Sequence, residues 1–252
     1  MEEFITIAKK EIPSVDHIFD EALSRLSLDK PFVKNNFGKA LILVDEKATK
    51  IYRSYERKAL EKLAVLWLGL QKEEVRRRLR IVLDQEGWER FLKEAKEVFV
   101  EFGILVQELE KDLGNMRKAR GGTTFEKMVL KLLGIIGIKA ERPGRKAKER
   151  LGRIDIVIPS VEVASETPDR AIFLTCKRTL RERWKQEVPQ ARLNQRIYLL
   201  TIDDNLSESK AEEINEKEFI AFVRDDIVEK QAFQKMPWIR RLSDLPKELK
   251  KI

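Results

Sequence analysis

Residues 153–158 read Arg-Ile-Asp-Ile-Val-Ile, and residues 171–177 read Ala-Ile-Phe-Leu-Thr-Cys-Lys. Runs of alternating apolar residues predict two β-strands, and Pro159 ends the first of them. Successive side chains of a strand point to opposite faces, so Asp155 faces away from the isoleucines beside it. The connection is short enough for a hairpin. The two strands are therefore predicted neighbours that bring the acid Asp155 and the base Lys177 to one site.

The rest of the second half has the same α/β character. Two further strands are predicted at residues 197–202 and 219–223, with a helix from about Ser207 between them. Strands that alternate with helices favour a layered α/β fold, here with a mixed sheet flanked by helices. We therefore expect an α/β core over residues 116–252, preceded by a mostly helical region over residues 1–115 that packs on it.

Apolar residues of the first half recur at three- and four-residue steps, which predicts helices. Two stripes are predicted core faces, so their aromatic residues are interpreted as packing rather than as a platform for bases. Gly121-Gly122 is expected to end this helical pattern, and Thr123 and Glu126 have the spacing of a capping box that opens a new helix. The stripes comprise Ile51, Tyr52, Tyr55, Ala59, Leu63, Leu66, Trp67 and Leu70, and then Trp88, Phe91, Leu92, Ala95, Val98, Phe99, Phe102, Leu105, Val106 and Leu109.

Composition narrows the classes of function. The single cysteine, Cys176, excludes an internal disulfide framework and a multi-cysteine zinc site, and the single histidine, His17, excludes multi-histidine metal sites. Charged residues make up 37% of the 252, which is typical of the ion-paired surfaces of thermophile proteins. The net charge of +8 favours a polyanionic partner. No apolar run reaches membrane-spanning length and no signal-peptide pattern is present, so we expect a soluble cytoplasmic protein without membrane contact.

Asp155 and Lys177 suit the cleavage of phosphodiesters. A carboxylate supplies hard oxygen ligands for Mg²⁺, and an ammonium group can orient water and stabilise the charge that develops on phosphate. One acid and one lysine on adjacent strands are equally compatible with a surface ion pair.

The next segment is more specific. Residues 177–186 read Lys-Arg-Thr-Leu-Arg-Glu-Arg-Trp-Lys-Gln. The chain here resembles the EcoRII and SsoII group of type II restriction endonucleases, which belong to the PD-(D/E)XK nuclease superfamily. The resemblance covers roughly residues 120–205. It implies a PD-(D/E)XK nuclease core in which Asp155 binds the metal and Lys177 is the catalytic lysine.

The resemblance also implies that Arg181, Glu182 and Arg183 read base edges in the major groove. Arginine can bind O6 and N7 of guanine and glutamate can accept from N4 of cytosine, so these residue types suit consecutive G·C pairs. In the alternative interpretation Thr179 and Glu182 cap a helix whose arginines are simply solvated. The two interpretations are compatible.

Two positions depart from the family pattern, and both concern metal ligands. The usual acid two residues before the lysine is Thr175, and the acid that this group carries thirteen residues after the lysine is Gln190. Glu187, one helical turn before Gln190, is the favoured substitute and third catalytic residue. Glu126 is the other acid that the group tends to use.

Basic residues near these strands are candidate phosphate contacts. The run from Arg142 to Arg153 is either a solvated loop or a phosphate clamp, and its place before the first strand favours the clamp. The predicted phosphate contacts are Arg145, Lys146, Lys148, Arg178 and Lys185.

Together these observations predict a Mg²⁺-dependent endonuclease that cuts double-stranded DNA at a palindromic site of the CC…GG kind and acts as a homodimer. Two alternatives stay open. One is a structure-specific nuclease resembling a Holliday-junction resolvase, and the other is a DNA-binding regulator on a catalytically decayed scaffold.

Overall fold

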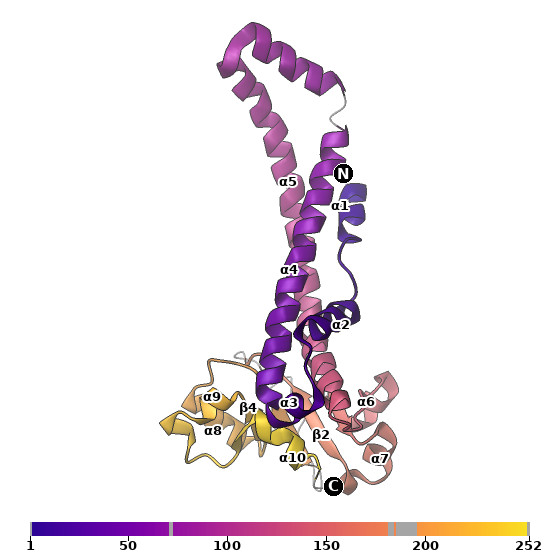
Figure 1. Cartoon of the computed structure of the whole chain (residues 1–252), viewed down its shortest axis with the longest axis vertical. Coiled ribbons are helices and arrows are strands. Elements are labelled where there is room, and N and C mark those ends of the chain that lie inside the picture. Colours follow the sequence, from indigo (N-terminus) through magenta and orange to yellow (C-terminus); the bar gives the residue numbers. More distant parts are fainter. Residues whose placement is uncertain (1, 71–72, 181–183, 185–195, 251–252) are drawn as a thin grey trace. The chain divides into compact units, whose positions relative to one another are not determined.

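The sheet lies in the second half of the chain. A computed structural model describes residues 2–70, 73–180, 184 and 196–250 (Figure 1). It contains five strands, arranged in the order β1-β2-β3-β4-β5. The strands are β1 (Ile156–Ile158), β2 (Ile172–Cys176), β3 (Arg196–Leu200), β4 (Ile220–Val223) and β5 (Ile239–Arg241).

The sheet is mixed, as the sequence predicts. β1 runs antiparallel to β2, with Ile156 opposite Leu174. β2, β3, β4 and β5 are parallel to one another. The four predicted strands are present, and β5 is a fifth that the sequence analysis missed. Every residue of β1 and β2 is buried, so both faces of these two strands are covered and neither face is solvated.

Along the chain, helices precede, separate and follow the strands. None of those in the described ranges is long and apolar enough to cross a membrane. The α-helices are α1 (Glu2–Lys9), α2 (Val15–Leu26), α3 (Lys30–Asn35), α4 (Phe37–Leu70), α5 (Glu73–Ile135), α6 (Arg145–Leu151), α7 (Val161–Glu166), α8 (Glu208–Glu216), α9 (Asp225–Val228) and α10 (Leu245–Glu248), and the 3₁₀ turns are η1 (Pro168–Arg170), η3 (Gln231–Phe233) and η4 (Leu242–Asp244).

The chain forms two compact units. The first comprises residues 1–18 and 49–120, and the second comprises residues 19–48 and 121–252. In the first unit α1 packs on α4 and α5 through a core that includes Ile5, Leu63 and Leu109. The second unit contains the sheet and its core.

The predicted helix start after Gly121-Gly122 is wrong. α5 continues through both glycines to Ile135, and the residue with non-helical backbone angles inside it is Gly87. Glycine costs a helix only about 1 kcal/mol relative to alanine. The buried side chains that follow, among them Phe125 and Val129, offset that cost. Glu126 therefore lies within a helix and does not belong to a capping box at a helix start.

The second apolar stripe is only partly core. Leu105 and Leu109 are buried, but Trp88, Leu92 and Phe99 are exposed at 61%, 50% and 72%. The helical period identifies which side chains share a face. It does not establish that another element covers that face, which is why the prediction fails for these three residues.

Gly38, in the first turn of α4, tests the packing of the second unit. A Cβ atom there would lie 2.9 Å from Cβ of Leu242 and 3.0 Å from Oδ1 of Asp225, which is closer than such atoms normally approach. We expect Gly38→Ala to destabilise the fold by about 1–3 kcal/mol through overpacking. Denaturant unfolding measures the change.

Gly134 provides the matched control, because it is also helical and has open space around its Cα. Gly134→Ala should be neutral or stabilise by up to about 1 kcal/mol. Equal effects of the two substitutions would contradict the close approach at Gly38.

Candidate functional site

Asp155 is fixed at the start of β1 by the adjoining strand. Its backbone N–H donates to the carbonyl of Leu174 at 3.0 Å. Its Oδ2 accepts from the backbone N–H of Cys176 at 2.8 Å and from the Thr175 hydroxyl at 3.3 Å. The carboxylate is 14% exposed. The first predicted metal ligand is therefore held rigidly by the backbone of β2.

Glu126 of α5 brings a second carboxylate to the same place. Its side chain is 9% exposed. Burial is the main cause that raises the pKa of Glu126, and the adjacent charge of Asp155 raises it further, with a contribution from hydrogen bonding between the two carboxyl groups. Two acids this close cannot both ionise freely without a nearby cation.

Two basic side chains provide that positive charge. Nε of Arg142 lies 2.6 Å from Oε2 of Glu126 in an ion pair that lacks the geometry of a hydrogen bond. Nζ of Lys148 lies 3.9 Å from Oδ1 of Asp155. Both cations oppose the upward shift in the pKa of Glu126.

Lys177 directly follows β2, and its backbone N–H donates to the carbonyl of Leu200. Burial first, and then the charges of Asp155 and Glu126, raise the pKa of the Cys176 thiol well above its ordinary value, while Lys177 opposes them. Lys177 thus lies within electrostatic range of the same group as the two acids. A buried cysteine with a raised pKa is a poor nucleophile, so the chemistry of this site belongs to its charged residues.

The donor set fits a hard divalent cation. Mg²⁺ is usually bound through one or two carboxylates while it keeps several waters, and Asp155 and Glu126 supply that number of carboxylates. Within the described ranges, no group of three or more His, Cys, Asp or Glu side chains forms a metal cluster. Glu187 and Gln190, which the sequence analysis considered as a third ligand, lie outside the described residues.

The predicted base-reading residues Arg181, Glu182 and Arg183, and the phosphate contact Lys185, also lie outside the described residues. Trp184, in the same segment, is described. It is buried in the core of the sheet and donates from Nε1 to Glu213, which agrees with a packing role.

Of the predicted phosphate contacts, Arg178 is paired with Asp45 of α4 at 2.7 Å. Arg145 and Lys146 are exposed in the first turn of α6. Lys148 of the same helix is the one that lies beside Asp155.

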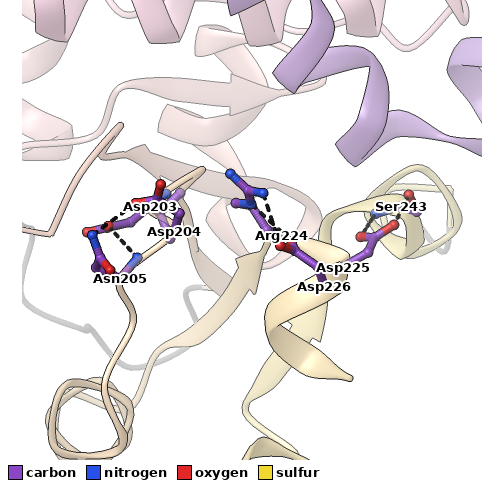
Figure 2. Close-up of polar contacts among 8 residues, drawn as sticks. Asp203, Asp204, Asn205, Arg224, Asp225, Asp226 and Ser243 are labelled. Atoms are coloured by element: carbon purple, nitrogen blue, oxygen red, sulfur yellow. Dashed lines mark hydrogen bonds and ion pairs between the residues drawn. The ribbon is translucent and has the colours of Figure 1, made fainter. Parts of the chain in front are cut away.

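Acidic residues that follow β3 and β4 have structural partners (Figure 2). Asp203 accepts from the backbone N–H groups of Leu180 and Asn205. Asp225 accepts from the backbone N–H and the hydroxyl of Ser243. Asp226 forms a two-point ion pair with Arg224, whose hydrogen bonds lower the pKa of the acid. Asp203 thus stabilises the turn after β3, Asp225 joins α9 to η4, and Asp226 is held by its arginine.

Comparison with known proteins agrees with the geometry of the site. The sequence profile of the family described as EcoRII C terminal matches residues 71–244, which is more than half of the chain. The chain belongs to the EcoRII C-terminal family. The predicted resemblance to this group of restriction endonucleases is thereby confirmed.

A curated relative from Shigella sonnei, the type II restriction enzyme SsoII, is 28% identical over 150 residues. The match covers 55% of this chain and 48% of the relative, so the chain spans about half the length of that protein.

Two solved restriction endonucleases share the fold. Metal-depleted Ecl18kI in complex with uncleaved, modified DNA matches with a TM-score of 0.75 and 19% identity, over 99% of this chain and 83% of that one. The complex of PspGI with substrate DNA matches with a TM-score of 0.65 and 20% identity, over 97% of this chain and 94% of that one. The predicted PD-(D/E)XK fold is therefore confirmed.

Sequence reasoning placed Asp155 and Lys177 on paired strands but did not foresee the contact of Glu126 with Asp155. Twenty-eight residues separate the two acids, and no local pattern joins them. The available signal was the helical period after Gly122, which places Glu126 beside the buried Phe125 and Val129. A buried acid needs a polar or charged partner. The partners of Glu126 are the carboxylate of Asp155 and the guanidinium of Arg142.

We expect Glu126→Gln to stabilise the metal-free protein at neutral pH. The pKa of Glu126 is raised in the folded state, so the wild type loses stability as the pH rises from the ordinary glutamate pKa of about 4.3 through the raised value. Glutamine cannot ionise and avoids that loss. The melting temperature of the variant in chelator should therefore exceed that of the wild type by a margin that grows with pH.

Glu149→Gln, at an exposed position of α6, is the control and should keep the pH dependence of the wild type. A difference between Glu126→Gln and the wild type that does not change with pH would contradict the buried acid pair.

Proposed function

We propose that this protein is a sequence-specific endonuclease that hydrolyses phosphodiester bonds of double-stranded DNA with Mg²⁺. The observation that carries the proposal is the pair of carboxylates, Asp155 and Glu126, whose charges act together with that of Lys177 on the buried Cys176, in a member of the EcoRII C-terminal family. The neighbours of known structure support it, because Ecl18kI and PspGI are both described as complexes with DNA.

Asp155 and Glu126 would hold the divalent cation, with Glu187 as the further acid that the sequence offers. When bound, a divalent cation polarises a phosphoryl oxygen and lowers the pKa of water. Oδ2 of Asp155 accepts from the backbone N–H of Cys176, so Oδ1, which faces Lys148, is the oxygen that would bind the cation.

Lys177 would act on the scissile phosphate. Its backbone is fixed at the end of β2, and its charge acts on the same buried thiol as the charges of the two acids. A positive charge there would orient the attacking water and stabilise the developing negative charge.

We further propose that Arg181, Glu182 and Arg183 read two adjacent G·C pairs in each half of a palindromic site of the CC…GG kind. Arg145, Lys146, Lys148, Arg178 and Lys185 would contact phosphates. A homodimer matches the two-fold symmetry of such a site, since each protomer then cuts one strand.

Incubation of the purified protein with plasmid and with genomic DNA in Mg²⁺, followed by sequencing of the new ends, tests the function. Discrete fragments whose ends share a sequence support the proposal. Cleavage confined to branched junctions would instead identify a structure-specific nuclease, and sequence-specific binding without cleavage would identify a regulator on a decayed scaffold.

Asp155→Asn and Lys177→Ala should each reduce cleavage by about 10²–10³-fold or more, because each removes a charge that acts at the transition state. Asparagine keeps an oxygen that can accept from the Cys176 N–H, so the strands should remain paired. Single-turnover cleavage measures the loss, and circular dichroism checks the fold. Near-normal turnover of either variant would refute its catalytic role.

The third ligand is decided by the same assay. Glu187→Ala should be almost as damaging as Asp155→Asn if Glu187 completes the metal site. Normal cleavage by Glu187→Ala, together with loss in Glu126→Ala or Gln190→Ala, would transfer the role to those residues.

Arg181→Ala and Arg183→Ala should reduce specific binding far more than non-specific binding. Each well-formed bidentate contact is worth roughly 1–3 kcal/mol against the wrong base. Competition binding with specific and scrambled duplexes measures the ratio. Lys146→Ala is the control, because a phosphate contact should weaken both kinds of binding alike. Cut sites that lack paired G·C steps in each half would overturn the assignment of the base-reading residues.

A further inference from the structure

Two of the basic side chains that precede β1 are paired with the acids that would hold the metal. Arg142 is ion-paired with Glu126 and Lys148 lies beside Asp155. The two acids carry two negative charges and the two bases carry two positive charges. Arg142 and Lys148 thus already neutralise the two acids without a divalent cation, and Lys177 adds further positive charge nearby.

A divalent cation would bring two further positive charges to the same two carboxylates. Because the acids are 9% and 14% exposed, the excess positive charge would be poorly screened by water. The cation and the two basic side chains therefore compete for the acids.

Both basic side chains can leave the acids, because they are long and remain partly exposed. The side chain of Arg142 is 37% exposed and that of Lys148 is 35% exposed. Nζ of Lys148 lies 3.9 Å from Oδ1 of Asp155, and this distance is too long for a direct hydrogen bond. DNA phosphates are the anions that could accept both side chains after they leave.

We propose that Arg142 and Lys148 are exchangeable counter-cations, which neutralise Glu126 and Asp155 in the free protein and transfer to DNA phosphates when the metal binds. The proposal rests on the endonuclease function above and deepens it. Metal and DNA then bind with positive coupling. Each ligand favours the separation of the basic side chains from the acids, and the other ligand no longer has to supply the free energy for that separation.

The coupling is reciprocal by thermodynamic necessity, and couplings between binding sites typically amount to about 5–150-fold in affinity. In the wild type, DNA should strengthen metal binding and metal should strengthen DNA binding by the same factor. Part of that factor should disappear when the counter-cations are removed.

The first experiment measures Ca²⁺ binding to the protein without DNA, by isothermal titration calorimetry at a mildly alkaline pH. Ca²⁺ is the probe because it is a hard cation that binds carboxylate oxygens. The double substitution Arg142→Gln with Lys148→Gln should tighten Ca²⁺ binding by at least about fivefold, the lower end of typical couplings. Lys148→Arg, which keeps the charge, should bind Ca²⁺ as the wild type does.

The second experiment measures DNA binding by fluorescence anisotropy across a range of salt concentrations, in chelator and in Ca²⁺. The probe is a short duplex with the sequence found at the cut ends, checked on a gel for integrity. Each phosphate contact contributes about 0.9 to the slope of log affinity against log salt. The double variant should lose about 1.8 from that slope in Ca²⁺, by twice the single-contact value, and almost nothing in chelator.

Lys146→Gln is the matched control, because Lys146 is exposed on the same helix and has no ion-pair partner in the described part of the chain. It should lose about 0.9 from the slope in both conditions and should leave Ca²⁺ binding without DNA unchanged.

Unchanged Ca²⁺ affinity in the double variant, or equal loss of slope in chelator and in Ca²⁺, overturns the counter-cation proposal while the endonuclease proposal stands. A wild-type protein that neither cuts DNA nor binds Ca²⁺ overturns the endonuclease proposal, and the counter-cation proposal with it. Thermal melting confirms that the double variant is folded in each titration.

Discussion

The hydrogen bond from the Cys176 N–H to the Asp155 carboxylate both holds two strands together and orients an acid of the candidate site. β1 has only three residues, and Asp155 lies immediately before it. A charge-assisted bond of this kind contributes roughly 1.5–3 kcal/mol, so it fixes the start of β1 against the end of β2 as well as the orientation of the carboxylate. One oxygen of Asp155 holds the strands together, and the other faces Lys148.

Thr175 explains how this site differs from the usual pattern of its superfamily. Its side chain is fully buried and donates to Asp155, where the superfamily ordinarily has an acid. A third carboxylate at this position would add a like charge beside Asp155 and Glu126, and the repulsion would raise the pKa of Glu126 further. The hydroxyl instead adds a hydrogen bond to Asp155 and no charge. The second acid of the site comes instead from another element, Glu126 of α5.

Elements with a clear hydrophobic periodicity could be predicted from the sequence, whereas contacts between elements far apart in the chain could not. The strands around Asp155 and Lys177 follow from alternation, and the family follows from the residues after Lys177. The helix through Gly121-Gly122 was missed because a glycine pair is a local signal that burial of Phe125 and Val129 overrides. β5 was missed because a strand of three residues, Ile239–Arg241, is too short to show a two-residue alternation. Glu126 was recognised as a candidate, but only tertiary structure places it beside Asp155.

The partners of an acid separate the structural carboxylates of this protein from those proposed to be functional. Asp203 and Asp225 are held by backbone N–H groups and a hydroxyl, which stay in place as long as the turns are folded (Figure 2). Oε2 of Glu126 and Oδ1 of Asp155 instead face the flexible cations Arg142 and Lys148. A carboxylate neutralised by a mobile base can exchange that base for a metal ion without unfolding. The identity of the partner therefore indicates which of these acids can exchange it for a metal ion.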